Sequence, residues 1–119
     1  MIFKSTQDIA AFTAPDHTVL KEVLHPDNDG IDLPYSLASA KLLVGTASLP
    51  HRLKSKELYY FLSGEGVIYV DGVAQAVQTG DIVLVPGNAE QYVENKGAID
   101  LSFLCIVSPK WQAAEDIPA

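Results

Sequence analysis

The stretch Gly45-Thr-Ala-Ser-Leu-Pro-His51-Arg-Leu53-Lys-Ser-Lys-Glu57 continues as Leu-Tyr59-Tyr-Phe61-Leu-Ser-Gly64 and decides the fold. A second stretch follows it: Gly80-Asp-Ile-Val-Leu-Val-Pro86-Gly-Asn88-Ala-Glu-Gln91-Tyr-Val93-Glu-Asn95. In both, short apolar or alternating runs are bounded by glycine, proline and asparagine. That pattern is typical of short strands joined by turns. The two stretches therefore predict β-structure.

The same pattern extends over most of the chain beyond residue 35. Strands are predicted over residues 36–44, 58–62, 66–70, 74–79, 82–85, 91–94 and 101–107. Asp71-Gly72 lies between two of them and marks a hairpin, because glycine tolerates the positive φ of a two-residue turn. Short strands at a spacing of about 8 to 12 residues are typical of a β-sandwich or barrel.

The chain is expected to divide into an N-terminal arm (1–35), a barrel (36–108) and a C-terminal tail (109–119). Ser5 and Asp8 have the spacing of a capping box, which predicts a short helix near the N-terminus. Thr18–Leu24 reads as a strand, and His25–Gly30 as a loop because it is rich in turn-forming residues.

The length, charge and hydrophobicity of the chain limit the kinds of protein it can be. With 119 residues the chain is long enough for one domain. A formal net charge of −7 disfavours a nucleic-acid partner, because such binding depends largely on lysine and arginine. No apolar run approaches the roughly 20 residues that span a membrane, and no secretory leader is visible. We therefore expect a soluble, cytoplasmic protein without a membrane or nucleic-acid partner.

The two stretches resemble the two motifs of the cupin superfamily, over roughly residues 36 to 108. Gly45, His51, Glu57 and Gly64 fall in register with the first motif, and Gly80, Pro86 and Asn95 with the second. Leu53, Asn88 and Gln91 depart from the motifs, since the family usually has His, Gly and His there. The resemblance implies an all-β double-stranded β-helix, or jelly-roll, and a short helix and strand arm would precede this barrel.

The resemblance also implies a metal site. Its ligands would be His51, Glu57 and the amide oxygen of Gln91, because Leu53 cannot coordinate. Zinc or nickel would be favoured over iron or manganese, and loss of imidazole ligands would weaken the site. The alternative is a metal-free polar cluster in which His51 bonds to Glu57, and Gln91 bonds to Tyr59 or water.

Strand alternation predicts a largely apolar pocket around these polar groups. Its expected walls are Leu53, Tyr59, Phe61, Val93, Phe103 and Cys105. Cys105 has no second cysteine to pair with and is read as a small buried side chain. His17 and His25 lie before the motifs and are read as partly exposed surface residues.

The sequence is compatible with three function classes. The first is a protein that binds a divalent metal, a small metabolite or both in the barrel lumen. The second is a metal-dependent isomerase, decarboxylase or dioxygenase acting on a small organic acid or sugar. The third is a metal-free barrel that serves a structural or partner-binding role. A homodimer is expected in addition, with Thr18–Leu24 adding to the sheet of a neighbour and covering an exposed edge.

Overall fold

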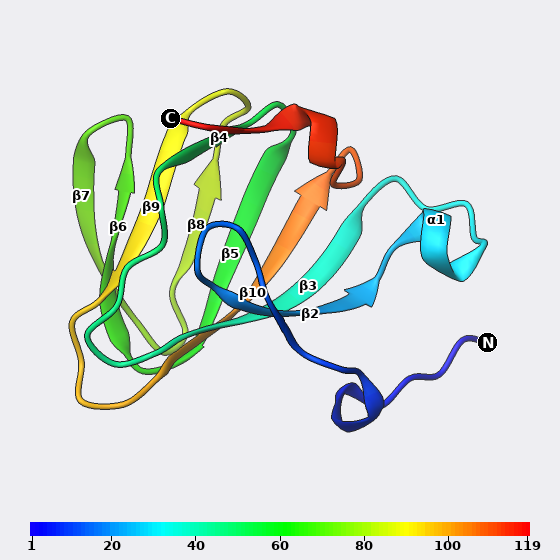
Figure 1. The fold of residues 1–119 in the computed structure, drawn as a ribbon, viewed down its shortest axis with the longest axis horizontal. Coiled ribbons are helices and arrows are strands. Elements are labelled where there is room, and N and C mark those ends of the chain that lie inside the picture. The colour runs from blue at the N-terminus through cyan, green and yellow to red at the C-terminus, as the bar shows by residue number, and fades with distance from the viewer.

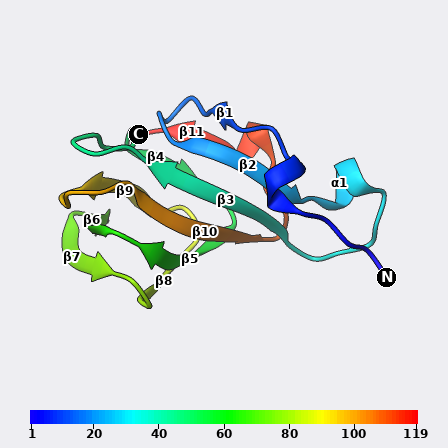
Figure 2. The same cartoon turned by 90° about the horizontal axis from the view of Figure 1, so that it is seen from below.

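The computed structural model describes residues 1–119 and has two antiparallel sheets that face each other (Figures 1 and 2). The six-stranded sheet has the order β1-β2-β3-β10-β5-β8, and the five-stranded sheet has the order β11-β4-β9-β6-β7. This arrangement confirms the all-β jelly-roll. None of the helices is both long and apolar enough to cross a membrane.

The strands follow the sequence prediction closely from residue 36 onward. Their bounds are β1 Phe12–Thr13, β2 Val19–Leu24, β3 Ser36–Leu42, β4 His51–Leu53, β5 Lys56–Ser63, β6 Glu65–Val70, β7 Val73–Gln78, β8 Ile82–Val85, β9 Glu90–Asn95, β10 Leu101–Ser108 and β11 Asp116–Pro118. The hairpin between β6 and β7 turns at Asp71 and Gly72, both with positive φ. β8 has the predicted bounds, and the other predicted strands differ by two residues or fewer at each end.

The core forms where alternate residues of the central strands point between the sheets. In β5, Tyr59 and Phe61 are buried, whereas their neighbours Tyr60 and Leu62 are exposed. Cross-strand pairing sets Phe61 opposite Phe103 of β10, and these two rings lie 5.4 Å apart between centroids. Tyr59 packs on Phe103 at 5.5 Å. These aromatic side chains pack in the interior between the two sheets. The polar residues at the start of β4 and β5 lie to one side of them.

The N-terminal arm differs in detail from the prediction. A three-residue 3₁₀ turn, η1 (Thr6–Asp8), follows Ser5, but the carbonyl of Ser5, not its side chain, accepts the bond from the amide of Asp8. The backbone is extended at Ile9, so the turn ends there. The predicted loop at 25–30 contains the short helix α1 (Pro26–Asp29), which begins with proline and ends at Gly30 in the left-handed region.

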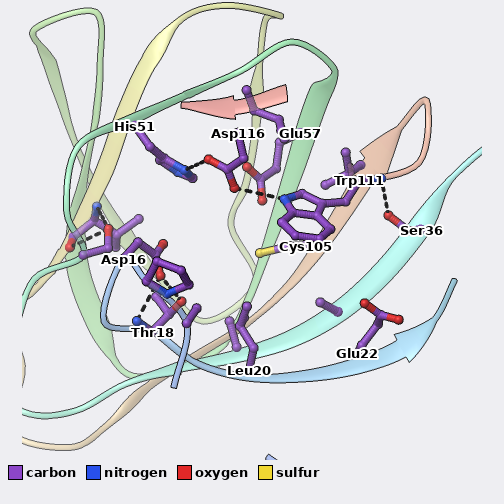
Figure 3. Close-up of a pocket in the computed structure, with 18 of the residues that line it drawn as sticks. Asp16, Thr18, Leu20, Glu22, Ser36, His51, Glu57, Cys105, Trp111 and Asp116 are labelled. Atoms are coloured by element: carbon purple, nitrogen blue, oxygen red, sulfur yellow. Dashed lines mark hydrogen bonds and ion pairs between the residues drawn. The ribbon is translucent and has the colours of Figure 1, made fainter. Parts of the chain in front are cut away.

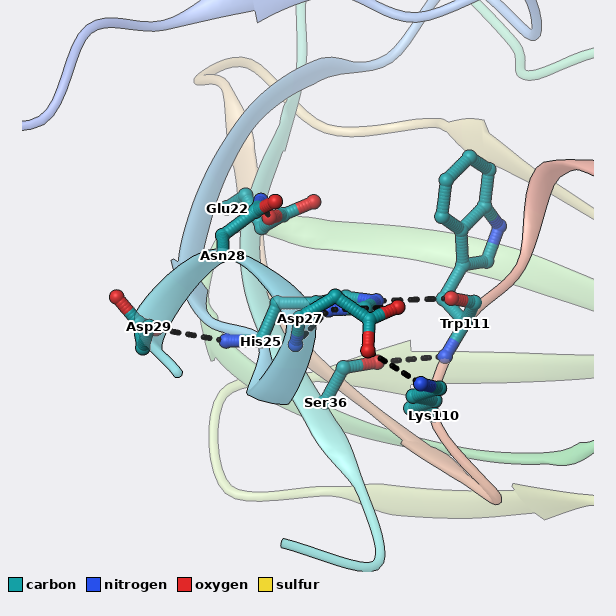
Figure 4. A network of polar contacts seen from close by, with 8 residues as sticks. All are labelled: Glu22, His25, Asp27, Asn28, Asp29, Ser36, Lys110 and Trp111. Carbon is teal, nitrogen blue, oxygen red and sulfur yellow. Dashed lines mark hydrogen bonds and ion pairs between the residues drawn. The ribbon is translucent and has the colours of Figure 1, made fainter. Parts of the chain in front are cut away.

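His25 precedes α1 and is buried, so its reading as a partly exposed residue is wrong. Its Nδ1 accepts a bond from the amide of Asp27, and its Nε2 lies 2.8 Å from the carbonyl oxygen of Trp111 (Figure 4). Nearby, the amide of Trp111 donates to Ser36 Oγ, and Lys110 pairs with Asp27. This network fastens the C-terminal tail to the arm.

The tail does not end as a loose extension. After the 3₁₀ turn η2 (Ala113–Glu115), β11 pairs antiparallel with β4, which places Asp116 opposite Leu53 and Pro118 opposite His51. Figure 1 shows this last segment lying across one end of the barrel beside β4. The tail thus covers the end of the lumen where His51 lies.

Candidate functional site

A cavity of about 290 Å³ opens into the lumen between the two sheets. Five of the expected pocket residues line it together with His51 and Glu57; these five are Leu53, Tyr59, Val93, Phe103 and Cys105. The arm and the tail supply further walls, among them Asp16, Leu20, Trp111 and Asp116 (Figure 3). More than half of the lining residues are hydrophobic.

The imidazole of His51 is held by the tail. Its Nδ1 lies 2.7 Å from Oδ1 of Asp116, and Oδ2 of Asp116 accepts a bond from Nε1 of Trp111 at 2.9 Å. Burial alone would lower the pKa of His51, but the hydrogen bond and charge of Asp116 raise it above its ordinary value. Burial acts to raise the pKa of Asp116, and the bonds from His51 and Trp111 lower it overall. The pair is therefore a fixed, charge-assisted contact.

Glu57 is the most perturbed acid of the site. Its side chain is buried, and Oε1 has no hydrogen-bond partner; no other buried side-chain nitrogen or oxygen of the chain lacks one. Burial raises the pKa of Glu57 from 4.5 to about 7, against the opposing effects of His51 and the Cys105 thiol. A buried polar atom normally has a partner, so Oε1 of Glu57 is an unsatisfied acceptor in the wall of the cavity.

Two expected site residues lie outside the cavity lining. Phe61 is fully buried in the aromatic core, and Gln91 is buried with 1% of its surface exposed. The amide oxygen of Gln91 accepts a bond from the hydroxyl of Tyr59. A bond between Gln91 and Tyr59 is the one expected in a metal-free cluster. His51 does not make the bond to Glu57 that was expected in the same cluster; its partner is Asp116.

The donors of the site are too few for a transition metal. No three His, Cys, Asp or Glu side chains come together closely enough to hold an ion. Leu53 fills its position with an apolar side chain, and Gln91 already accepts from Tyr59. A stable zinc or nickel site usually needs at least three protein ligands. The residues present therefore do not fit such a site in this arrangement.

Sequence reasoning missed the contributions of the two flanking segments. Asp116 contacts His51 across 65 residues of sequence, and Trp111 and Asp16 line the same cavity. No local pattern pairs these residues with the barrel motifs. Asp116-Ile-Pro118 is also too short a strand to stand out by alternation. Only the pairing of β11 with β4 brings Asp116 to His51.

Similarity to known proteins supports the jelly-roll architecture. A family model described as cupin domain matches residues 39–107. The uncharacterized protein MJ1618 of Methanocaldococcus jannaschii is 33% identical over 92% of this chain and 89% of its own length. An oxalate-binding protein of Thermotoga maritima is 29% identical over 76% of this chain and 71% of its own. The crystal structure of a predicted oxalate decarboxylase from Thermotoga maritima, 22% identical, superposes with a TM-score of 0.80 over 91% of this chain and 99% of that one.

Proposed function

This chain belongs to the cupin domain family, and from that premise we propose that it binds a small organic molecule in the lumen of its barrel. The observation that carries the proposal is the unpartnered, buried Oε1 of Glu57 at the wall of an apolar cavity. Small-ligand sites are usually concave and apolar, with a few polar groups that fix orientation. The name of the oxalate-binding relative supports a small ligand as the occupant.

The cavity and its donors favour this class of function over the other two. A structural barrel would be expected to fill its lumen with side chains, whereas here Tyr59, Phe103 and Leu53 border open space. A metal-dependent enzyme would need a ligand set that the present donors do not supply. Metal binding by His51, Glu57 and Gln91 stays a prediction, and so does the cytoplasmic location.

The test is a fragment screen by protein NMR on metal-free protein. We expect at least one fragment to shift the amide signals of Tyr59, Cys105 and Asp116, because these residues border the cavity from three different strands. Replacing Glu57 with Gln should weaken a fragment whose N–H donates to this carboxylate about tenfold, through the loss of one charge-assisted hydrogen bond. Glu65→Gln, an exposed carboxylate outside the cavity, is the matched control.

The same screen can contradict the proposal. If every binding fragment shifts only residues outside the cavity, the lumen is not the site and the proposal fails. Calorimetry with zinc and nickel on the wild type and on His51→Ala decides the metal prediction separately. Tight binding that disappears in the variant would show that the donors rearrange around an ion.

We also propose that the protein forms a homodimer, through the outer face of the six-stranded sheet. Tyr60 is 44% exposed, and Ile82 and Leu84 of β8 are each 62% exposed. Cross-strand pairing sets Tyr60 opposite Ile82 and Leu84 opposite Leu58, so these side chains form one uncharged surface. Interface cores are depleted of charged residues, and a second copy offers the same apolar surface without bringing charge to it.

The strand Thr18–Leu24, which was predicted to add to the sheet of a neighbour, has another role within the chain. As β2 (Val19–Leu24), it pairs with β3 on one side and with the short β1 on the other. Its main partners therefore come from its own sheet. The outer face formed by β5 and β8 takes its place in the proposed dimer.

Leu84→Lys is expected to shift the protein from dimer to monomer. Each dimer buries the exposed 62% of this side chain twice, and full burial of a leucine contributes about 1.5 to 3 kcal/mol, so the dissociation constant should rise at least about tenfold. Light scattering coupled to size exclusion measures the mass. Val73→Lys, at a residue 69% exposed on the other sheet, should leave the mass unchanged. A monomeric wild type at high micromolar concentration would contradict the proposed dimer.

A further inference from the structure

The charges that line the cavity are nearly all negative. Four acids contribute to the wall, namely Asp16, Glu22, Glu57 and Asp116, whereas no lysine or arginine does. The remaining titratable cations are His25 and His51. The lining thus has no permanent positive charge to attract an anion.

The two histidines supply little free positive charge. The Nδ1 of His25 accepts a hydrogen bond from the amide of Asp27, so this nitrogen is already engaged within the chain. Its Nε2 then donates to the carbonyl of Trp111. The charge of His51, when present, is matched by Asp116 at 2.7 Å. Neither imidazole is therefore an unmatched anion-binding group.

The four acids differ in whether their carboxylate oxygens already accept hydrogen bonds. Both carboxylate oxygens of Asp116 accept bonds, from His51 and Trp111. Asp16 accepts from the amide and hydroxyl of Thr18. Glu22 accepts from Asn28. Only Glu57 keeps a buried oxygen without a partner, and in the ionised form this carboxylate accepts a hydrogen bond from a ligand.

The walls beside Glu57 suit an apolar body that carries a cation. Tyr59, Phe103 and Trp111 all line the cavity. Aromatic faces attract ammonium groups through their quadrupole, most strongly where water is excluded. An apolar body would replace water against Leu53 and Val93. A carboxylate in the same place would lie among acids with no unmatched cation to compensate its charge.

We infer that the lumen selects an organic ammonium ion, an amine with a compact apolar or aromatic body whose N–H donates to Oε1 of Glu57. The inference rests on the proposed lumen site and names the class of its ligand. It also sets this chain apart from the relative named for oxalate, because a dianion has no counter-charge in this cavity.

The test compares four probes on metal-free protein by calorimetry at pH 8: benzylamine, benzyl alcohol, benzoate and oxalate. We expect benzylamine to bind at least tenfold more tightly than benzyl alcohol, and the two anions not to bind. Glu57→Gln should weaken benzylamine at least tenfold while changing benzyl alcohol less than threefold. Retained binding of benzyl alcohol also reports that the variant is folded. Glu65→Gln should bind all four probes as the wild type does.

The contrary outcomes separate the inference from the function it rests on. Benzoate or oxalate binding as tightly as benzylamine would overturn the ammonium assignment and leave the lumen as a binding site. Equal binding of benzylamine by the wild type and Glu57→Gln would do the same. If none of the four probes binds, the ammonium assignment also falls, and the fragment screen alone decides whether the lumen takes a ligand.

Discussion

Replacing Glu57 with Gln is expected to increase the free energy of unfolding of the ligand-free protein at pH 8 by on the order of 3 kcal/mol. Burial raises the pKa of this carboxyl from 4.5 to about 7. Each pKa unit corresponds to about 1.4 kcal/mol of difference between the two protonation states. The folded wild type therefore carries an unfavourable buried charge at pH 8, which the neutral amide of the variant avoids.

The expected difference in the free energy of unfolding between the variant and the wild type depends on pH. Below pH 4.5 the carboxyl is protonated in both the folded and the unfolded chain, so the wild type and the variant should unfold at similar urea concentrations. Between pH 4.5 and about 7 the unfolded chain loses its proton first, and the wild type loses stability relative to the variant. Above pH 7 the difference should stay constant.

Urea denaturation at pH 4.5, 6 and 8 measures the difference directly. Comparing the variant with the wild type at each pH removes the contribution of all other titrating groups. Glu65→Gln, at an exposed position, should give a difference near zero at every pH. A Glu57→Gln variant less stable than the wild type at pH 8 would mean that the carboxylate makes favourable contacts that outweigh its burial.

Replacing Phe61 with Ala is expected to lower the free energy of unfolding by about 3 to 5 kcal/mol. The side chain is fully buried, and its ring lies 6.0 Å from that of Tyr59 and 5.4 Å from that of Phe103. Removing it takes apolar surface out of the core and leaves a void that the neighbouring strands close only in part. For a domain of this size that loss approaches the whole stability.

Phe3→Ala provides a control with the same chemical change. Phe3 is 83% exposed, so its removal should change stability by less than about 0.5 kcal/mol. Urea denaturation followed by circular dichroism gives both values. If Phe61→Ala cost less than about 1 kcal/mol, the core would have to close over the missing ring far more completely than rigid strands normally allow.

The strands were predictable because their signals are local. In β5 the alternation of buried Tyr59 and Phe61 with exposed Tyr60 and Leu62 is visible in the sequence itself. Glycine at position 72 fixes the end of a hairpin in the same way. α1 was not predicted, because its four residues are all turn formers and only the proline and the left-handed Gly30 define its ends.

The site was predictable only in part, for a different reason. The motif register identified His51 and Glu57, and alternation identified Tyr59 and Phe103 as pocket walls; all four line the cavity. The partner of His51 depends on the pairing of β11 with β4, which brings together positions 65 residues apart. Contacts of that range leave no periodic trace in a single sequence.

The division of the cavity wall between barrel and flanking segments has an evolutionary consequence. Asp16, Trp111 and Asp116 all lie outside residues 39–107, the part that matches the family model. Substitutions there alter what the cavity contacts and leave the Phe61 and Phe103 packing untouched. On the proposed function, ligand preference could therefore diverge among related barrels through changes in two short terminal segments, which makes the architecture modular.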